Sequence, residues 1–208
     1  MVVVNLITLI LSITVHEFGH AFVADRLGDR LPRSQGRVTL SPLAHADPIG
    51  TLALPAILML TGSSVGFGWG RPVMVNPLSF NRKFSMRTAH LFVAAAGPLM
   101  NLLFGILISL VLWVLFTNNL IGVEVAQALY SAVFMNFILM FFNLIPFPPL
   151  DGGTVLAGLL PSHMLPTWEG VSRYGILIVA LIAFTPLNKL FLVPAQKFFQ
   201  LWMGLLGF

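Results

Sequence analysis

The chain has 208 residues, of which 57% are hydrophobic and only 9% are charged, and it carries 11 Lys and Arg against 7 Asp and Glu. Soluble domains contain about 25% charged residues, so this composition excludes a soluble globular protein and indicates one that is embedded in a lipid bilayer. The cationic excess then reports topology and not nucleic-acid binding, and the lack of cysteine excludes disulfides, thiolate metal ligands and a cysteine nucleophile.

Apolar segments suited to transmembrane helices follow one another along the chain. A span requires about 20 residues, and three segments meet this length while the last two are short and separated by Pro186. The last two are therefore two spans or one broken hairpin. Residues 1–15 lack the basic region and the cleavage site of a signal peptide, so we expect the first segment to be retained. The five segments are 2–24, 88–116, 123–144, 171–184 and 187–206.

A sixth apolar run, 49–60, is short and contains Pro55, which favours a re-entrant segment over a crossing. If it turns back, all the cations on either side of it lie on one face of the membrane, and the positive-inside rule makes that face the cytoplasm. The loop at 117–122 has no Lys or Arg and would face outward, as would the amino terminus. These cations are Arg26, Arg30, Arg33, Arg37, Arg71, Arg82, Lys83 and Arg87.

Two polar connections have the composition of short strands. Residues 36–43 (GRVTLSPL) and 68–77 (GWGRPVMVNP) contain Val and Thr and are bounded by Gly and Pro. We therefore expect an all-α polytopic membrane protein with about five transmembrane helices, a short re-entrant segment and a small β-sheet at the cytoplasmic face. The whole chain, 1–208, is expected to form one domain, with a core at 1–160 and C-terminal helices at 170–208.

Three ionisable residues interrupt the first apolar segment. His16 and His20 are four positions apart, so on a helix both imidazoles share one face and can bind the same cation. Glu17 completes the pattern H-E-x-x-H, in which the histidines bind zinc and the carboxylate takes a proton from water. The alternative is a polar face packed against other helices. Each buried ionisable group costs about 2.5–3.5 kcal/mol within a span, which favours a metal site.

A catalytic zinc site needs a third protein ligand, and Asp151 is the strongest candidate. It follows an apolar run that prolines break in the sequence NLIPFPPLDGG, and such breaks are tolerated at membrane depth beside a cavity. The alternative for Asp151 is a helix cap in a loop. The other acids and histidines lie at span ends, among arginines or in loops; they are Asp25, Asp29, His45, Asp47, His90, Glu124, His163 and Glu169.

With these stretches together, the sequence resembles the site-2 protease family of intramembrane zinc metalloproteases. HEFGH at 16–20 fits the family's H-E-x-x-H, NLIPFPPLDG at 143–152 fits its N-x-x-P-x-x-P-L-D-G, and AGPLMN at 96–101 fits its G-P-x-x-N. LSPLAHADPIGT and GFGWGRPVMVNP are similar to the compact subgroup without a PDZ domain. We accordingly expect no PDZ or CBS domain and no helix before the first span, and GWGRPV has Gly70 and Arg71 where relatives often have a small residue and Lys.

The resemblance implies one zinc ion held by His16, His20 and Asp151, with Glu17 as general base and acid. It implies a substrate that is a transmembrane segment of another protein, cut in or near the bilayer of a prokaryotic cell membrane from the cytoplasmic side. Asn143 would orient the substrate or stabilise the oxyanion.

Three further residues are expected to bind substrate, each with an alternative. Asn101 is one, although both asparagines have the alternative of interhelical hydrogen bonding. Gly68 and Trp69 belong to the stretch GFGWGRPVMV, which could pair with an unwound substrate strand or could be plain sheet structure.

Two other interpretations of the sequence remain open. The first is a membrane metal transporter in which His16 and His20 are transit ligands, although no internal repeat of the kind found in transporters is visible. The second is a silent protein that binds membrane substrates, which the intact Glu17 disfavours. His45 and Asp47 line a water path, support a ligand or form a structural turn.

Overall fold

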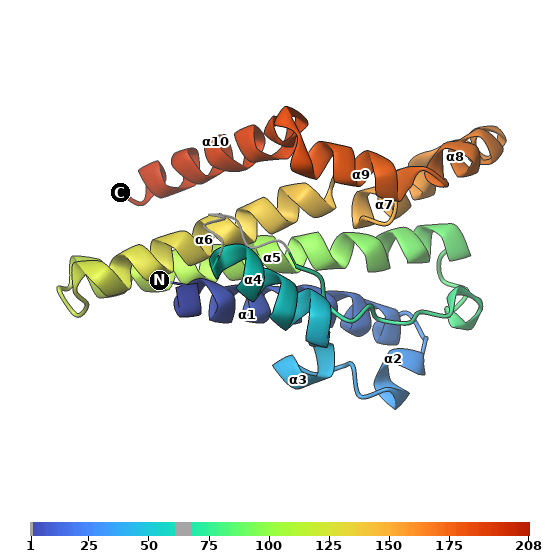
Figure 1. Ribbon diagram of the computed structural model, residues 1–208. Helices are drawn as coiled ribbons and strands as arrows, with labels where there is room; N and C mark the ends of the chain where they lie inside the picture. Colours follow the sequence, from blue (N-terminus) through green and yellow to red (C-terminus); the bar gives the residue numbers. More distant parts are fainter. Residues whose placement is uncertain (1, 61–67) are drawn as a thin grey trace.

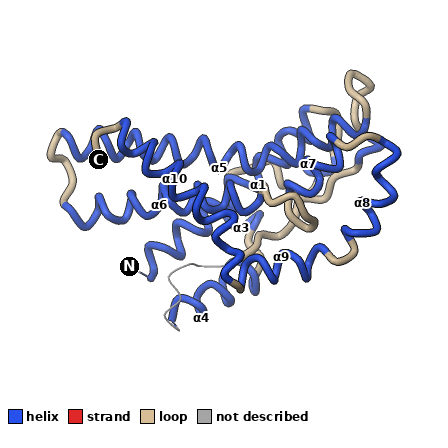
Figure 2. The backbone as a smooth tube through the Cα atoms, turned by 90° about the horizontal axis from the view of Figure 1, so that it is seen from above, coloured by secondary structure: helices blue, strands red, loops and turns tan. Residues whose placement is uncertain are grey.

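The computed structural model describes residues 2–60 and 68–208, and every regular element in those ranges is helical (Figures 1 and 2). Three helices are long and apolar enough to cross a membrane: α1 (Val2–Arg26), α5 (Met86–Thr117) and α6 (Val123–Asn143). They lie side by side in Figure 1, with α5 in contact with both of the others. The protein is therefore a helical membrane protein built on a three-helix core.

The ends of the core helices follow from local sequence. Ser85 caps α5 by accepting a hydrogen bond from the amide of Thr88. The α5–α6 turn begins at Asn118, and Asn119 there has a positive φ of 56°, which asparagine tolerates better than most residues. Helix α6 ends at Asn143, shortly before the prolines that prevent its continuation.

Shorter helices surround the core. Between α1 and α5 lie α2 (Leu31–Ser34), α3 (Pro42–His45), η1 (Pro48–Ala53), α4 (Leu54–Leu60) and η2 (Pro77–Ser79). After α6 follow α7 (Asp151–Leu159), η3 (Ser162–Met164), α8 (Leu165–Ser172), α9 (Gly175–Phe184), η4 (Pro186–Asn188) and α10 (Lys189–Leu205).

The C-terminal segments, which the sequence left open as two spans or one broken hairpin, do not form two separate full-length spans. The segments Ser162–Ser172 and Gly175–Phe184 bend by 64° at their junction and make at most one broken span. Helix α10 has 17 residues and contains Pro194, and it packs on α6 through aromatic pairs such as Tyr130 with Phe199. Within the described chain there are thus three candidate spans, or four if the bent pair counts as one, where five were expected.

The predicted cytoplasmic-face β-sheet was wrong, because no described residue forms a strand. Residues 68–71 bond to helical turns and not to a strand partner. The Trp69 amide donates to the Gly50 carbonyl at 3.1 Å, the Thr51 hydroxyl donates to the Trp69 carbonyl at 2.7 Å, and the Arg71 amide donates to the His45 carbonyl at 2.8 Å. The Val- and Pro-rich composition therefore encodes an extended connection. Gly66 and Phe67 of the predicted strand region lie outside the described residues.

The same hydrogen bonds show where the chain between η1 and residue 69 begins and ends. The chain enters this segment at Gly50 and Thr51, and it returns to the same two residues at Trp69. The helices η1 and α4 together cover Pro48–Leu60, which is shorter than the roughly 20 residues of a span. The chain segment that begins at Thr51 and ends at Trp69 therefore starts and finishes at the same place in the structure.

Glycines allow the elements around the site to approach closely. A Cβ on Gly19 of α1 would lie 2.7 Å from the Ala96 carbonyl oxygen of α5, so no side chain fits between the two helices here. On α7, a Cβ on Gly152 would lie 2.3 Å from the Leu144 carbonyl oxygen, and one on Gly153 would lie 2.5 Å from the Pro148 nitrogen. The tight fold of residues 144–153 holds the start of α7 against the core.

Candidate metal centre

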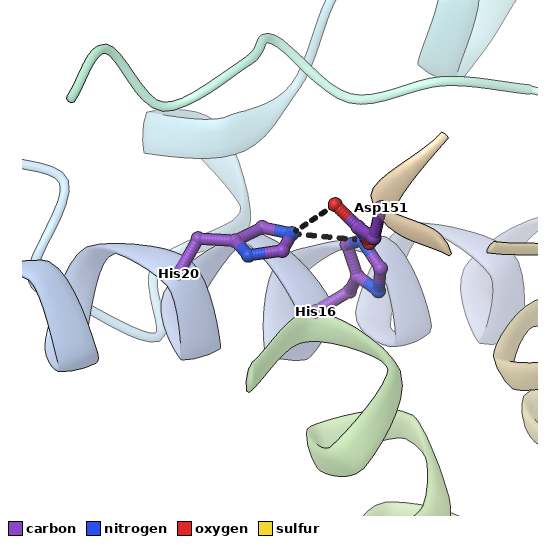
Figure 3. Close-up of side chains that lie close together, drawn as sticks. All are labelled: His16, His20 and Asp151. Carbon is purple, nitrogen blue, oxygen red and sulfur yellow. Dashed lines mark hydrogen bonds and ion pairs between the residues drawn. The ribbon is translucent and has the colours of Figure 1, made fainter. Parts of the chain in front are cut away.

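Three ligand atoms converge where α1 meets the start of α7. His16 and His20 project from one face of α1 toward Asp151, which comes from a distant part of the chain (Figure 3). The His16 Nε2 atom lies 3.1 Å from Asp151 Oδ2, the His20 Nε2 atom lies 3.3 Å from Asp151 Oδ1, and the two Nε2 atoms are 3.1 Å apart. These are the three residues that the sequence predicted as metal ligands, brought into one cluster.

The hydrogen bonds on the far side of each imidazole set its tautomer. His20 Nδ1 lies 2.7 Å from the Val93 carbonyl oxygen, which can only accept, so this nitrogen carries the proton. His16 Nδ1 lies 2.7 Å from the Asn101 Oδ1 atom, which also accepts. In the neutral form of each ring, the Nε2 atom then keeps a lone pair that faces the other histidine and the carboxylate.

With both rings in this neutral form, His16, His20 and Asp151 present lone pairs to a common point, where one cation can bind all three residues. The Asp151 Oδ2 atom is buried and has no hydrogen-bond partner among the described residues, so its negative charge is unsatisfied by the protein alone. A tetrahedral centre with bonds of about 2.0–2.1 Å separates its ligand atoms by about 3.3 Å, close to the spacings here. Two imidazoles and one carboxylate are also a donor set typical of catalytic zinc. The residues fit a zinc ion.

A cavity of about 490 Å³ opens beside the ligands, and Glu17 lies in its wall. The Glu17 carboxylate has no hydrogen bond or ion pair within the described ranges of the chain. It packs beneath Gly70, where an added Cβ would lie 3.1 Å from Glu17 Cγ and 3.3 Å from Oε1. Glu17 is therefore a carboxylate without a protein partner among the described residues, beside the cluster of His16, His20 and Asp151 and facing the cavity.

The other residues predicted to act on substrate also line this cavity. Asn143 closes α6 and donates from Nδ2 to the Leu139 carbonyl at 3.0 Å, which leaves one amide hydrogen and Oδ1 for a ligand. Gly68 and Trp69 lie at the start of the extended connection. Asn101 is fully buried, and its polar atoms are all engaged by protein groups.

Several candidates from the sequence lie apart from the cluster. Asp25 accepts two hydrogen bonds from Arg33, at 2.7 and 2.8 Å, and serves as an ion-pair partner. The Asp47 Oδ1 atom accepts from the amides of Ile49 and Gly50 and caps η1, so its contacts are those of a structural turn. His45 is fully buried, with Nε2 2.8 Å from the Thr39 carbonyl oxygen.

The structure adds residues that the sequence analysis did not identify. Gly97 of α5 lies directly against both ligands, since an added Cβ would be 2.4 Å from His20 Nε2 and 2.6 Å from His16 Cε1. Asn136 of α6 is fully buried and bonded to Asn101. A lone asparagine in the apolar run SAVFMNFILM was a signal that could have drawn attention to Asn136.

The helical membrane core and the cluster of two histidines, one aspartate and a free glutamate define a membrane-embedded metallohydrolase. A model of peptidase family M50 matches residues 4–128 and 115–184. The chain therefore belongs to peptidase family M50, the site-2 protease family, and it is a zinc metalloprotease.

Curated relatives agree with this assignment. A protein of Bacillus subtilis named "Putative zinc metalloprotease YwhC" is 36% identical over 196 residues, which cover 90% of this chain and 83% of the relative. The Rip2 protein of Mycolicibacterium smegmatis, named in the same way, is 31% identical over 204 residues, which cover 92% of this chain and 71% of the relative. No solved structure matches the chain. The comparisons give no support to the transporter alternative.

Proposed function

We propose that His16, His20 and Asp151 hold the zinc ion and that Glu17 is the general base of an endopeptidase that cleaves transmembrane segments of other proteins. The observation that carries this proposal is the convergence of two imidazole nitrogens, 3.1 Å apart, on the two oxygens of the Asp151 carboxylate at 3.1 and 3.3 Å, beside a cavity that the Glu17 carboxylate lines. When bound, zinc polarises the scissile carbonyl and makes its water more acidic.

Glu17 takes the proton of the attacking water and delivers it to the leaving amine. A general base needs an available carboxylate within reach of the water, and Glu17 is free of protein partners among the described residues and faces the cavity. Its neighbour Gly70 keeps this side of the carboxylate clear, because any side chain there would press on Glu17 and on Ile13. Asn143 has an amide hydrogen available in the same space and supports the developing oxyanion.

The substrate backbone pairs with the extended connection between residues 70 and 75. This connection is anchored by Trp69 and Arg71 at one end and by Asn76 at the other, where the Asn76 amide donates to Asp29 Oδ2 at 2.6 Å. Between these anchors the backbone makes no hydrogen bonds with the described residues. Pro72, Val73 and Val75 of this connection line the cavity, so its backbone runs along the site. An unwound substrate peptide can therefore form backbone hydrogen bonds with this connection as an added strand.

The topology that we propose places the active site toward the cytoplasm of a multi-pass protein in a prokaryotic cell membrane, with 1–208 acting as one domain. Thr51 and Trp69 are hydrogen-bonded to each other, so the chain segment between them starts and ends at the same place. The cations before and after this segment then lie on one side of the membrane. The α5–α6 turn and both chain ends lie at the other end of the core in Figure 1, where Phe208 packs on Phe116 with ring centroids 5.7 Å apart.

Replacement of Glu17 by Gln tests the proposal. The change keeps size and zinc ligands but removes the proton acceptor, so cleavage of a reporter membrane segment should fall by about 10²–10⁴-fold while one zinc per chain is retained. The matched control is Ser109→Ala, which alters a buried polar group of α5 remote from the cavity. Cleavage by the Glu17→Gln variant at the wild-type rate would show that the base is another group.

A further inference from the structure

The imidazole of His16 is held by side chains, whereas that of His20 is held by backbone. His20 Nδ1 donates to the Val93 carbonyl, an acceptor that no substitution removes. His16 Nδ1 donates to Asn101 Oδ1 on α5, and an amide side chain can present either oxygen or nitrogen at that position. The orientation of the Asn101 amide therefore decides whether His16 can be a metal ligand.

Two further contacts fix that orientation. The Asn101 Nδ2 atom donates to the Ser12 carbonyl of α1 at 3.1 Å and to Asn136 Oδ1 on α6 at 3.2 Å. Asn136 in turn is oriented by its own Nδ2 atom, which donates to the Ala132 carbonyl at 2.9 Å. Each donor thus faces an acceptor, in a chain that starts at a backbone carbonyl of α6 and ends at His16.

The directions in this chain follow by elimination. The Ala132 carbonyl can only accept, so Asn136 must turn its nitrogen toward it and its oxygen toward Asn101. Asn101 must then turn its nitrogen toward Asn136 and its oxygen toward His16. His16 is left with a proton on Nδ1 and a lone pair on Nε2, the form that binds a metal.

We propose that Asn101 and Asn136 are positioning residues that fix the tautomer and the ring orientation of His16 for zinc, an inference that rests on the proposed zinc site. Asn101 and Asn136 are fully buried, so water does not replace a lost partner there. Asn136 does not line the cavity and has no hydrogen bond to His16, His20 or Asp151 among the described residues, so it acts through Asn101. The sequence predicted that Asn101 binds substrate. Its side-chain oxygen and nitrogen are instead engaged by His16, Ser12 and Asn136, which fits a positioning role better.

A pair of variants of similar size separates hydrogen bonding from packing at position 101. Asn101→Leu fills the space but offers no acceptor to His16, and zinc affinity should fall by about 10–100-fold, the usual effect of losing a partner of a ligating histidine. Asn101→Asp keeps an acceptor for His16 and, protonated in apolar surroundings, a donor for the Ser12 carbonyl. This variant should recover most of the affinity.

The measurement is the dissociation constant for Zn²⁺ of the purified full chain, by competition with a chelator, together with the visible spectrum of the Co²⁺ form. Asn136→Ala should weaken zinc binding less than Asn101→Leu, because the Ser12 carbonyl still restrains Asn101. The double variant should bind as weakly as Asn101→Leu alone, since both changes act on one hydrogen-bond chain. Ser109→Ala, a buried α5 change that touches Trp202 and not the site, should bind zinc as the wild type does.

The outcomes distinguish this inference from the proposed function. Wild-type protein that takes up no zinc would overturn both. Wild-type protein that binds zinc, with Asn101→Leu giving the same affinity and Co²⁺ spectrum, would overturn the positioning role alone, as would additive losses in the double variant. If Asn101→Leu is not recovered folded, Asn136→Ala and Asn101→Asp carry the test, and wild-type affinity in the former or a loss as large as about 100-fold in the latter refutes the role.

Discussion

Replacement of Gly97 by Ala should damage the proposed metal site while the chain still folds, with a modest loss of stability. The added Cβ would lie 2.4 Å from His20 Nε2, whereas an ordinary contact begins at 3.4 Å, so the ring or the helix must move by about 1 Å. A displacement of about 1 Å at a reacting centre costs about 10²-fold in rate. Because the crowded atom is a proposed metal ligand, zinc affinity should fall with activity.

Stability should fall by about 0–2.5 kcal/mol, because two effects partly oppose each other. Ala in place of Gly within a helix contributes about 0.5–1 kcal/mol, and overpacking costs about 1–3 kcal/mol. Gly204→Ala on α10 is the matched control, since nothing lies within 4 Å of the position that its Cβ would take. Zinc titration, reporter cleavage and thermal unfolding of the zinc-free proteins are the assays. If Gly97→Ala cleaves and binds zinc like Gly204→Ala, the close packing of Gly97 on the histidines is refuted.

Three other substitutions give distinct results. Asp151→Ala should remove stoichiometric zinc, whereas Asp47→Ala should keep it and lose about 0.5–2 kcal/mol of stability through the missing η1 cap; the opposite zinc contents would show that Asp47 is the ligand. Asn143→Ala should lower kcat by about 10²–10³-fold with zinc content unchanged, and an unaltered kcat would exclude the oxyanion role. Asp29→Ala should leave the backbone amides of Leu31 and Asn76 without their acceptor and lower the free energy of unfolding by about 1–3 kcal/mol for each lost bond. Thermal unfolding measures this loss, and wild-type stability would show that these bonds are dispensable.

The convergence of His16, His20 and Asp151 could be predicted because its signals in the sequence are local. A spacing of four between His16 and His20 fixes a shared helix face wherever the helix lies. Asp151 follows a proline-broken apolar run, where an acid is costly unless it binds a cation or takes part in function. The need for a third ligand then joined two distant stretches, and the structure brings these three residues together.

The sheet and the helix count could not be predicted in the same way, because they depend on partners distant in sequence. The composition of residues 68–77 fits a strand, but strand formation needs a second strand, and the acceptors for Trp69 and Arg71 are carbonyls of Gly50 and His45 in helical turns. The last two apolar segments were short for spans and left two arrangements open in sequence, and in the structure α8 and α9 bend against each other while Pro186 separates α9 from α10. Asn136 was missed because its role exists only through Asn101.

Zinc K-edge X-ray absorption on the purified protein tests the central claim most directly. Our account predicts one zinc per chain with four nitrogen and oxygen ligands at about 2.0–2.1 Å, of which two scatter as imidazole. In Asp151→Ala protein reloaded with zinc, the two imidazoles should remain while the site loses a protein oxygen ligand and binds zinc more weakly. A first shell with three or more imidazoles, or an Asp151→Ala spectrum and affinity identical to those of the wild type, would contradict the assignment of His16, His20 and Asp151.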